Sequence, residues 1–275
     1  MTVKVVVGIS GSGEPIVLLH GLGASRRLWH RVAPLLASSG RRVLTPDLPG
    51  FGNSPPAGPG FEFPAVTEAL AVALRRRTRS PFDLLGHSLG GAVALQFATE
   101  YPELVRRLVL AAPAGFTPRA WPVASVAGAL AEPALAARRI AGRPLSASAT
   151  ARRVLLWGAV AEPQHLARAD AQLVLSSSGA ATRLGPALAE VLRTDLRPLL
   201  RRLEAPVGVI WGECDRVVPI STLEVIRAIR PQVAVETIPG AAHIPQLERP
   251  EEFVAAVLRV LDRLPDPDPA ADTIS

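Results

Sequence analysis

The stretch Gly86-His87-Ser88-Leu89-Gly90 lies between an apolar run at 82–86 and a helical pattern at 89–100. It matches the pattern Gly-x-Ser-x-Gly, in which a serine occupies a sharp turn from a strand into a helix. Glycine is needed on both sides, because a β-carbon in so tight a turn would clash with its neighbours. The pattern predicts that Ser88 is a nucleophile above the edge of a sheet, the alternative being an ordinary glycine-rich turn.

On both sides of this motif, short β-rich runs alternate with longer amphipathic ones, the pattern of parallel strands joined by crossover helices. We expect strands near 3–9, 16–20, 42–46, 82–86, 105–111, 207–211 and 233–238. We expect helices near 27–38, 64–77, 89–100, 221–230 and 250–262. This order predicts an α/β fold with a mostly parallel, doubly wound sheet.

The segment 116–200 interrupts this alternation. It is rich in Ala, Leu and Arg, contains no strand-like run and is punctuated by prolines. These features predict a set of short helices inserted into the sheet domain. We therefore divide the chain into a core of 1–115 and 201–275 and a helical insertion of 116–200.

Composition excludes several classes of protein. With 275 residues, 48% of them hydrophobic and 20% charged, the chain is too apolar to be intrinsically disordered. Cys214 is the single cysteine, so no disulfide can form within the chain, and no Cys/His cluster has the spacing of a zinc site. We therefore expect a protein of the reducing cytoplasm with no metal.

Neither a membrane span nor a nucleic-acid surface is expected. The longest stretch without a charged residue, 84–99, is shorter than the roughly 18 apolar residues of a spanning helix, and the N-terminus resembles a first strand more than a signal peptide. The net charge of +6 comes from arginine pairs spread over many elements without an aromatic stacking surface. These pairs are expected to lie on solvated helix faces.

A serine nucleophile needs a base, and the base needs a group that fixes its tautomer. His243 and Asp215 each follow the end of a different expected strand, where open α/β sheets place their sites. We predict His243 as base and Asp215 as orienting acid, with Glu213 as the nearby rival.

The other histidines are expected to be structural. His20 can shape the turn before Gly21, and His87 points away from the neighbouring serine, while His30 and His165 fall in helical stretches. The loop after 42–46 begins with Asp47 before Leu-Pro-Gly, where a carboxylate usually binds loop amides.

When Ser88 attacks an acyl carbon, an oxyanion forms that needs preorganised hydrogen-bond donors. Backbone amides are well suited to this role. The loop His20-Gly-Leu-Gly follows the strand at 16–20, and we predict the amides of Leu22 and Leu89 as the two donors. A phosphate-binding role is disfavoured, because the loop lacks the third glycine of a dinucleotide motif and the Lys-Ser/Thr pair of a P-loop.

Together these segments resemble the α/β-hydrolase family, specifically its capped, esterase-like branch, which also holds C–C bond hydrolases and cofactor-free perhydrolases. The similar segments are His20-Gly-Leu-Gly, Asp47-Leu-Pro-Gly-Phe-Gly-Asn-Ser, Gly86-His-Ser-Leu-Gly-Gly, Trp211-Gly-Glu-Cys-Asp-Arg-Val-Val-Pro and Gly240-Ala-Ala-His. The resemblance implies the α/β-hydrolase fold, a catalytic triad of Ser88, Asp215 and His243, and a cap (lid) formed by 116–200.

Two differences from other members of this family restrict the possible reactions. Haloalkane dehalogenases and epoxide hydrolases use an aspartate nucleophile, which Ser88 does not match. The C–C hydrolases resemble this chain around Ala112-Pro-Ala-Gly-Phe, yet their longer oxyanion loop is not matched. We predict a carboxylesterase; the alternatives are cleavage of a C–C bond in a β-diketone-like substrate, or a thioesterase, lactonase or perhydrolase.

No metal or organic cofactor is implied by this chemistry, and the expected partner is a small hydrophobic ester or related acyl substrate. The insertion offers Leu155, Leu156, Trp157 and Trp121 as apolar candidates to line the substrate pocket, although packing between cap and core would explain them equally well. From another class, a ligand-sensing protein could keep the triad and turn over negligibly.

Overall fold

A computed structural model describes residues 3–117, 129, 144–176 and 182–266. Its seven strands form one sheet in the order β1-β3-β2-β4-β5-β6-β7. The strands are β1 Val7–Ser10, β2 Glu14–Leu19, β3 Arg41–Pro46, β4 Phe82–His87, β5 Val105–Ala111, β6 Val207–Gly212 and β7 Ala234–Ile238. All neighbouring pairs are parallel except β1 and β3, which confirms the mostly parallel sheet.

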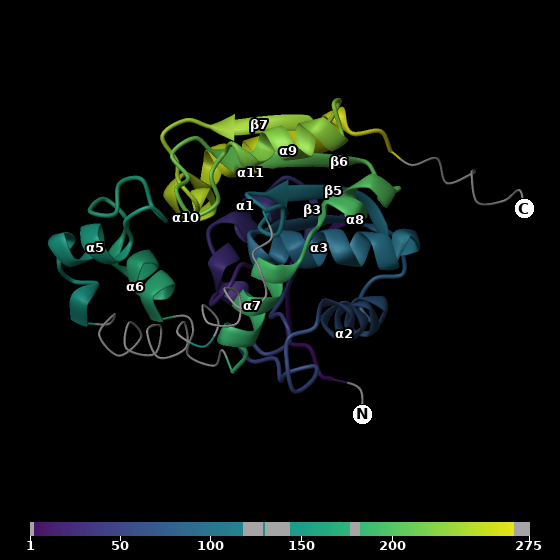
Figure 1. Cartoon of the computed structure of the whole chain (residues 1–275), viewed down its shortest axis with the longest axis horizontal. Helices are drawn as coiled ribbons and strands as arrows, with labels where there is room; N and C mark the ends of the chain where they lie inside the picture. The colour runs from purple at the N-terminus through teal and green to yellow at the C-terminus, as the bar shows by residue number, and fades with distance from the viewer. Residues whose placement is uncertain (1–2, 118–128, 130–143, 177–181, 267–275) are drawn as a thin grey trace, which may run out of the picture.

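Helices cover both faces of the sheet (Figure 1). One face is covered by α1 Val32–Ser38 and α11 Pro250–Arg263, which also pack against each other. The other is covered by α2 Phe63–Arg75, α3 Leu89–Glu100, α8 Arg197–Arg202 and α9 Thr222–Ile229. The remaining helical pieces are η1 Arg26–Trp29, η2 Pro102–Leu104, α5 Ala149–Leu155, α6 Arg168–Ser176, α7 Leu184–Arg193 and α10 Pro245–Glu248.

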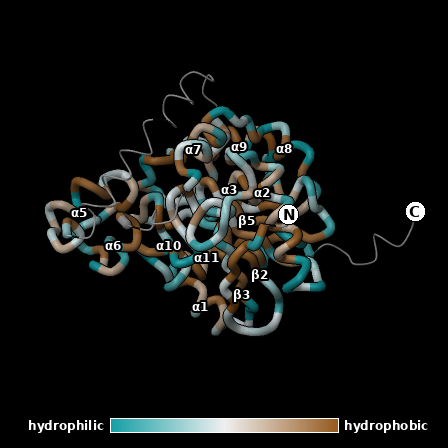
Figure 2. Tube along the Cα trace, turned by 90° about the horizontal axis from the view of Figure 1, so that it is seen from below, coloured by the Kyte–Doolittle hydropathy of each residue, from teal (hydrophilic) through white to brown (hydrophobic). Residues whose placement is uncertain are grey.

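The period-two alternation of strand side chains divides the core into two layers. In β2, Val17 and Leu19 join the cluster under α2 and α3, whereas Ile16 and Leu18 join the cluster under α1 and α11. Figure 2 shows the hydrophobic colour along β2 and β3 in the interior, with hydrophilic segments toward the outside. A strand buried on both faces explains why β2 reads as a continuous apolar run.

Between β5 and β6 the described residues include the helices α5, α6, α7 and α8. Figure 1 shows α5 and α6 set to one side of the sheet. Helix α6 contacts η1, and its Asp170 pairs with His30 and Arg31, which follow η1. By contrast, α8 packs against α3 and α9. A boundary at 200/201 therefore falls inside a helix that lies with the core.

The helix expected at 27–38 is two separate pieces, η1 and α1. Pro34 has no N–H, and in the middle of one continuous helix its ring would clash with the preceding turn. Because α1 begins at Val32, Pro34 falls in its first turn, where the missing N–H costs nothing. No helix in the described part of the chain is both long and apolar enough to cross a membrane.

A buried ion cluster stabilises the sheet at the amino ends of its strands, opposite the end where Ser88 lies. Asp83, near the start of β4, is fully buried and pairs with Arg41 of β3 and with Arg106 and Arg107 of β5. Burial alone would raise the pKa of Asp83, but hydrogen bonds from Arg107 and Arg106 and the charge of Arg41 outweigh it and lower that pKa. The carboxylate thus pairs with three guanidinium groups at once.

We expect Asp83→Ala to lower the free energy of unfolding by about 3–5 kcal/mol, because it removes the shared carboxylate from three closely spaced, largely buried arginines. Since the folded-state pKa lies below the unfolded one, this stabilisation is present above the unfolded pKa and is lost as the pH falls through the folded one. Urea unfolding at pH 7 measures the effect, with Asp262→Ala on the exposed side of α11 as control. Equal destabilisation by both variants would contradict it.

Candidate active site

Ser88 occupies the turn between the end of β4 and the first residue of α3. Its backbone has φ 56° and ψ −117°, a conformation that residues other than glycine rarely adopt. A β-carbon on Gly86 would lie 2.2 Å from the carbonyl oxygen of Gly90, and one on Gly90 would lie 2.4 Å from that of Leu19. The two glycines are therefore required by the turn, as the sequence pattern indicated.

Three side chains from three loops meet at this turn. The Nε2 atom of His243, in the loop after β7, lies 3.1 Å from the Oγ of Ser88. Its Nδ1 lies 2.7 Å from the Oδ2 of Asp215, in the loop after β6. The other carboxylate oxygen of Asp215 accepts hydrogen bonds from the amides of Val217 and Val218, at 2.8 and 3.0 Å. The structure thus brings together the three residues that the sequence singled out.

The hydrogen bonds assign the tautomer of His243. Asp215 accepts two backbone N–H bonds on one oxygen, which suits an ionised carboxylate, so Nδ1 of His243 carries the proton and donates it to Oδ2. The opposite nitrogen, Nε2, is left with its lone pair toward the Ser88 hydroxyl. All three residues are less than 10% exposed, so few waters compete for these bonds.

The two residues predicted to supply oxyanion-binding amides, Leu22 and Leu89, both line the cavity that contains Ser88. Leu89 is the first residue of α3, so its N–H has no partner within the helix. Leu22, in the loop after β2, lines the same cavity as Leu89 and Ser88. The amide of Ser88 itself is engaged, because it donates to the carbonyl of Ala111 at 2.9 Å.

Two other buried histidines hold the backbone. His20 bridges two loops: Nδ1 donates to the carbonyl of Gly21 at 2.9 Å, and Nε2 accepts from the amide of Leu48 at 3.0 Å. His87 donates from Nε2 to the carbonyl of His243 at 2.7 Å. Burial lowers the pKa of His20 to about 4, and burial together with the nearby His243 lowers that of His87 to about 3.

The other histidines and carboxylates that the sequence analysis considered lie away from Ser88. His30 pairs with Asp170, and His165 pairs with Glu162 at the surface. Glu213 accepts an exposed hydrogen bond from Thr237, and Asp47 accepts from the amides of Arg26 and Asn53, as expected for a loop-stabilising carboxylate. No group of three or more potential metal ligands occurs among the described residues.

A cavity of about 390 Å³ opens beside Ser88 and His243. Its walls are mostly apolar, and the face of α7 that carries Leu184, Leu188, Val191 and Leu192 supplies one of them. The apolar spacing of these four residues is visible in the sequence, but an amphipathic face looks the same whether it covers a core or a cavity. Sequence reasoning therefore missed α7 as a pocket wall.

Three of the predicted pocket residues, Leu155, Leu156 and Trp157, lie elsewhere. Leu156 is fully buried in a separate cluster with Val160 and Leu166, against which Leu155 packs. Trp157 is 69% exposed, and its ring stacks with the guanidinium of Arg216 at 5.2 Å. None of the three lines the cavity beside Ser88. Trp121 lies outside the described residues.

Comparison with known sequences settles the family. The profile of the family described as alpha/beta hydrolase fold matches residues 14–250. The chain belongs to this family. It is 32% identical over 257 residues to the pimeloyl-[acyl-carrier protein] methyl ester esterase of Aeromonas hydrophila, with 90% of this chain and 95% of the relative covered.

Other relatives of this alpha/beta hydrolase have different names. The pyrrolizixenacetamide deacetylase of Xenorhabdus hominickii is 30% identical over 262 residues, covering 90% of each chain. Among solved structures, a thermophilic esterase from Thermogutta terrifontis has a TM-score of 0.74 and 25% identity, covering 94% of this chain and 93% of that one. An esterase from Exiguobacterium antarcticum, at 22% identity and a TM-score of 0.77 over 94% of this chain and 96% of that one, shares the fold.

The Ser88 turn gives a prediction about stability. We expect Gly90→Ala to lower the free energy of unfolding by roughly 1–3 kcal/mol or more, because the new methyl group meets the backbone carbonyls of Leu19 and His20, which cannot rotate away. The matched control is Gly58→Ala, whose methyl group would lie 3.6 Å from the nearest atom. Chemical unfolding of both variants followed by circular dichroism is the measurement, and a wild-type curve for Gly90→Ala would contradict the expectation.

Proposed function

We propose that this alpha/beta hydrolase cleaves carboxylic esters through an acyl-enzyme on Ser88. The observation that carries the proposal is the hydrogen-bonded chain from Ser88 Oγ through His243 to Asp215, at the wall of an apolar cavity. The similarity to esterases supports the same reaction.

In the first step, Nε2 of His243 takes the proton of Ser88 Oγ as that oxygen attacks the acyl carbon. We assign the amides of Leu22 and Leu89 to hold the negative oxygen that forms, and Asp215 to stabilise the imidazolium. His243 then gives the proton to the leaving alcohol. In the second step, water loses a proton to His243 and attacks the acyl-enzyme, which releases the acid and returns the proton to Ser88.

The cavity indicates the substrate class. Apolar walls favour a substrate with a hydrophobic acyl or alcohol part, and a volume of about 390 Å³ suits a small or medium-sized ester. We further propose that 116–200 acts as a cap: Ala159, Val174 and Leu175, together with the apolar face of α7, come from this stretch and line the cavity. The cap would then set specificity, while the core supplies the reacting groups.

Variants of the triad test the proposal. We expect Ser88→Ala to lower kcat on p-nitrophenyl esters by about a million-fold, and Asp215→Asn by roughly ten thousand-fold, because the three residues act as a unit. Arg75→Ala, on the surface of α2, serves as a control for folding and purity. Activity that survives Ser88→Ala would rule out the acyl-enzyme.

The base also sets the pH dependence. His243 must be neutral to accept the serine proton, so kcat/KM should rise with pH as its imidazole loses a proton. With its pKa lowered to about 3, His87 stays neutral over the measured range and does not contribute. Initial rates between about pH 5 and 9 measure this, and a flat profile would contradict the role of His243 as base.

A substrate panel separates esters from the other reactions of the fold. Simple esters, thioesters, lactones and β-diketones are assayed in parallel, each with Ser88→Ala as the control. We expect the highest kcat/KM on esters. A preference for β-diketones of tenfold or more would favour C–C bond cleavage instead.

A further inference from the structure

Three consecutive backbone amides around His243 all have specific acceptors. The amide of His243 donates to the carbonyl of Ala159 at 3.1 Å. Those on either side, of Ala242 and Ile244, donate to the carboxylate of Glu248 at 3.1 and 3.3 Å. The carbonyl of His243 is held by His87. The backbone of the expected base is therefore fixed from both directions.

Glu248 also reaches a different part of the chain. Its Oε2 accepts a hydrogen bond of 2.7 Å from the amide of Ala161, in the segment between α5 and α6. The neighbouring Gly158 accepts from the amide of Arg216, which follows Asp215. One side chain thus ties the His243 loop to the inserted helical segment, and that segment in turn contacts the Asp215 loop.

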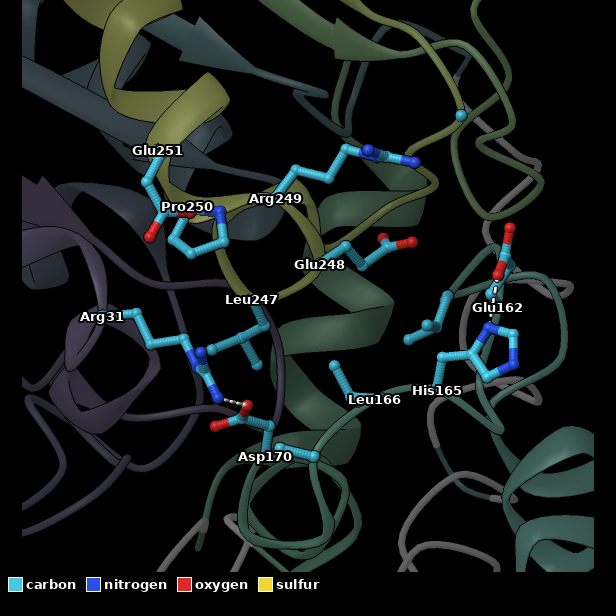
Figure 3. Close-up of a pocket in the computed structure, with 13 residues that line it drawn as sticks. Arg31, Glu162, His165, Leu166, Asp170, Leu247, Glu248, Arg249, Pro250 and Glu251 are labelled. Carbon is cyan, nitrogen blue, oxygen red and sulfur yellow. Dashed lines mark hydrogen bonds and ion pairs between the residues drawn. The ribbon is translucent and has the colours of Figure 1, made fainter.

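A second cavity, of about 410 Å³, borders this segment at Val160 and Glu162 (Figure 3). Glu248 is part of its wall, and the titratable groups that line it with Glu248 are Arg31, Glu162, His165, Asp170, Arg249 and Glu251. On its other side Glu248 faces Asp215 and the His243 loop. Burial raises the pKa of Glu248, with a further contribution from the charge of Asp215, against the lowering effect of its three N–H donors.

We propose that Glu248 is a positioning residue for hydrolysis, which holds His243 in line between Ser88 and Asp215 and couples this alignment to the inserted segment. The proposal rests on the proposed function of Ser88 and His243. Both oxygens of Glu248 accept N–H bonds, as an ionised carboxylate does, so no other side chain of this length can satisfy all three amides.

Two consequences follow for the reaction. First, the His243 ring must keep both of its hydrogen bonds while a proton passes through it, and a shift of about 1 Å in such a ring can cost roughly a hundredfold in rate. Second, Glu248 lies close enough to Asp215 for their charges to interact, and a further negative charge beside this pair would favour the imidazolium that forms during catalysis.

The test is Glu248→Gln, which keeps the shape but places an NH₂ group against a backbone N–H and removes the charge. We expect kcat to fall by roughly 10- to 100-fold with little change in KM, and the acid limb of kcat/KM to move to lower pH because the imidazolium loses support. Rates are taken per active site, counted by fluorophosphonate labelling of Ser88, so that unfolded protein does not enter the comparison. The matched control is Glu251→Gln, an exposed glutamate on the wall of the same cavity, which should leave both quantities unchanged.

Glu248→Asp separates geometry from charge and serves if the Gln variant does not fold. It keeps the charge but is too short to reach all three amides, so kcat should fall while the acid limb stays in place. A kcat within twofold of wild type for Gln, or for Asp where Gln does not fold, would overturn the proposal. Ser88→Ala distinguishes this failure from failure of the proposed function: if that variant stays active, the serine mechanism itself is wrong.

Discussion

The left-handed turn at Ser88 is the constraint around which the site is built. A serine holds φ 56° at a cost of order 1–3 kcal/mol, and such a conformation persists only where the surroundings fix it. Here the amide of Ser88 donates to Ala111 of the adjacent strand, and its carbonyl accepts from Gly91, Ala92 and Ala114. The turn is thus held by α3 and by the end of β5 together, which fixes the backbone that carries the Ser88 hydroxyl.

The parallel sheet then explains why the partners of Ser88 come from distant parts of the chain. Parallel neighbours end at the same edge, so the loops after β2, β4, β6 and β7 converge there, bringing Leu22, Ser88, Asp215 and His243 together. The opposite edge carries the buried cluster at Asp83, where three arginines bind strands β3, β4 and β5 together. The buried ion cluster and the residues around Ser88 therefore lie at opposite ends of the same strands.

Sequence patterns revealed what depends on local rules and missed what depends on tertiary contacts. All seven strands were visible as apolar runs, and the Gly86-His-Ser-Leu-Gly90 pattern located Ser88, because steric limits on a tight turn act within five residues. The prediction of one helix over 27–38 was wrong, because it followed the amphipathic pattern and neglected the effect of Pro34. Glu248 left no signal, since its partners are backbone amides and any sequence supplies those. The pocket walls were missed because burial of Leu156 and exposure of Trp157 depend on how the insertion folds back on the core.

Three buried histidines lie near this edge, and their surroundings give them different chemistry. For His20 and His87 the dominant effect is desolvation, which disfavours the charged ring, and each donates to a backbone carbonyl as a neutral group. His243 is buried to a similar degree, but it faces the carboxylate of Asp215, and Glu248 lies beyond its backbone. His20 and His87 each use a ring nitrogen to bind a backbone carbonyl, whereas both ring nitrogens of His243 face side chains, Ser88 on one side and Asp215 on the other.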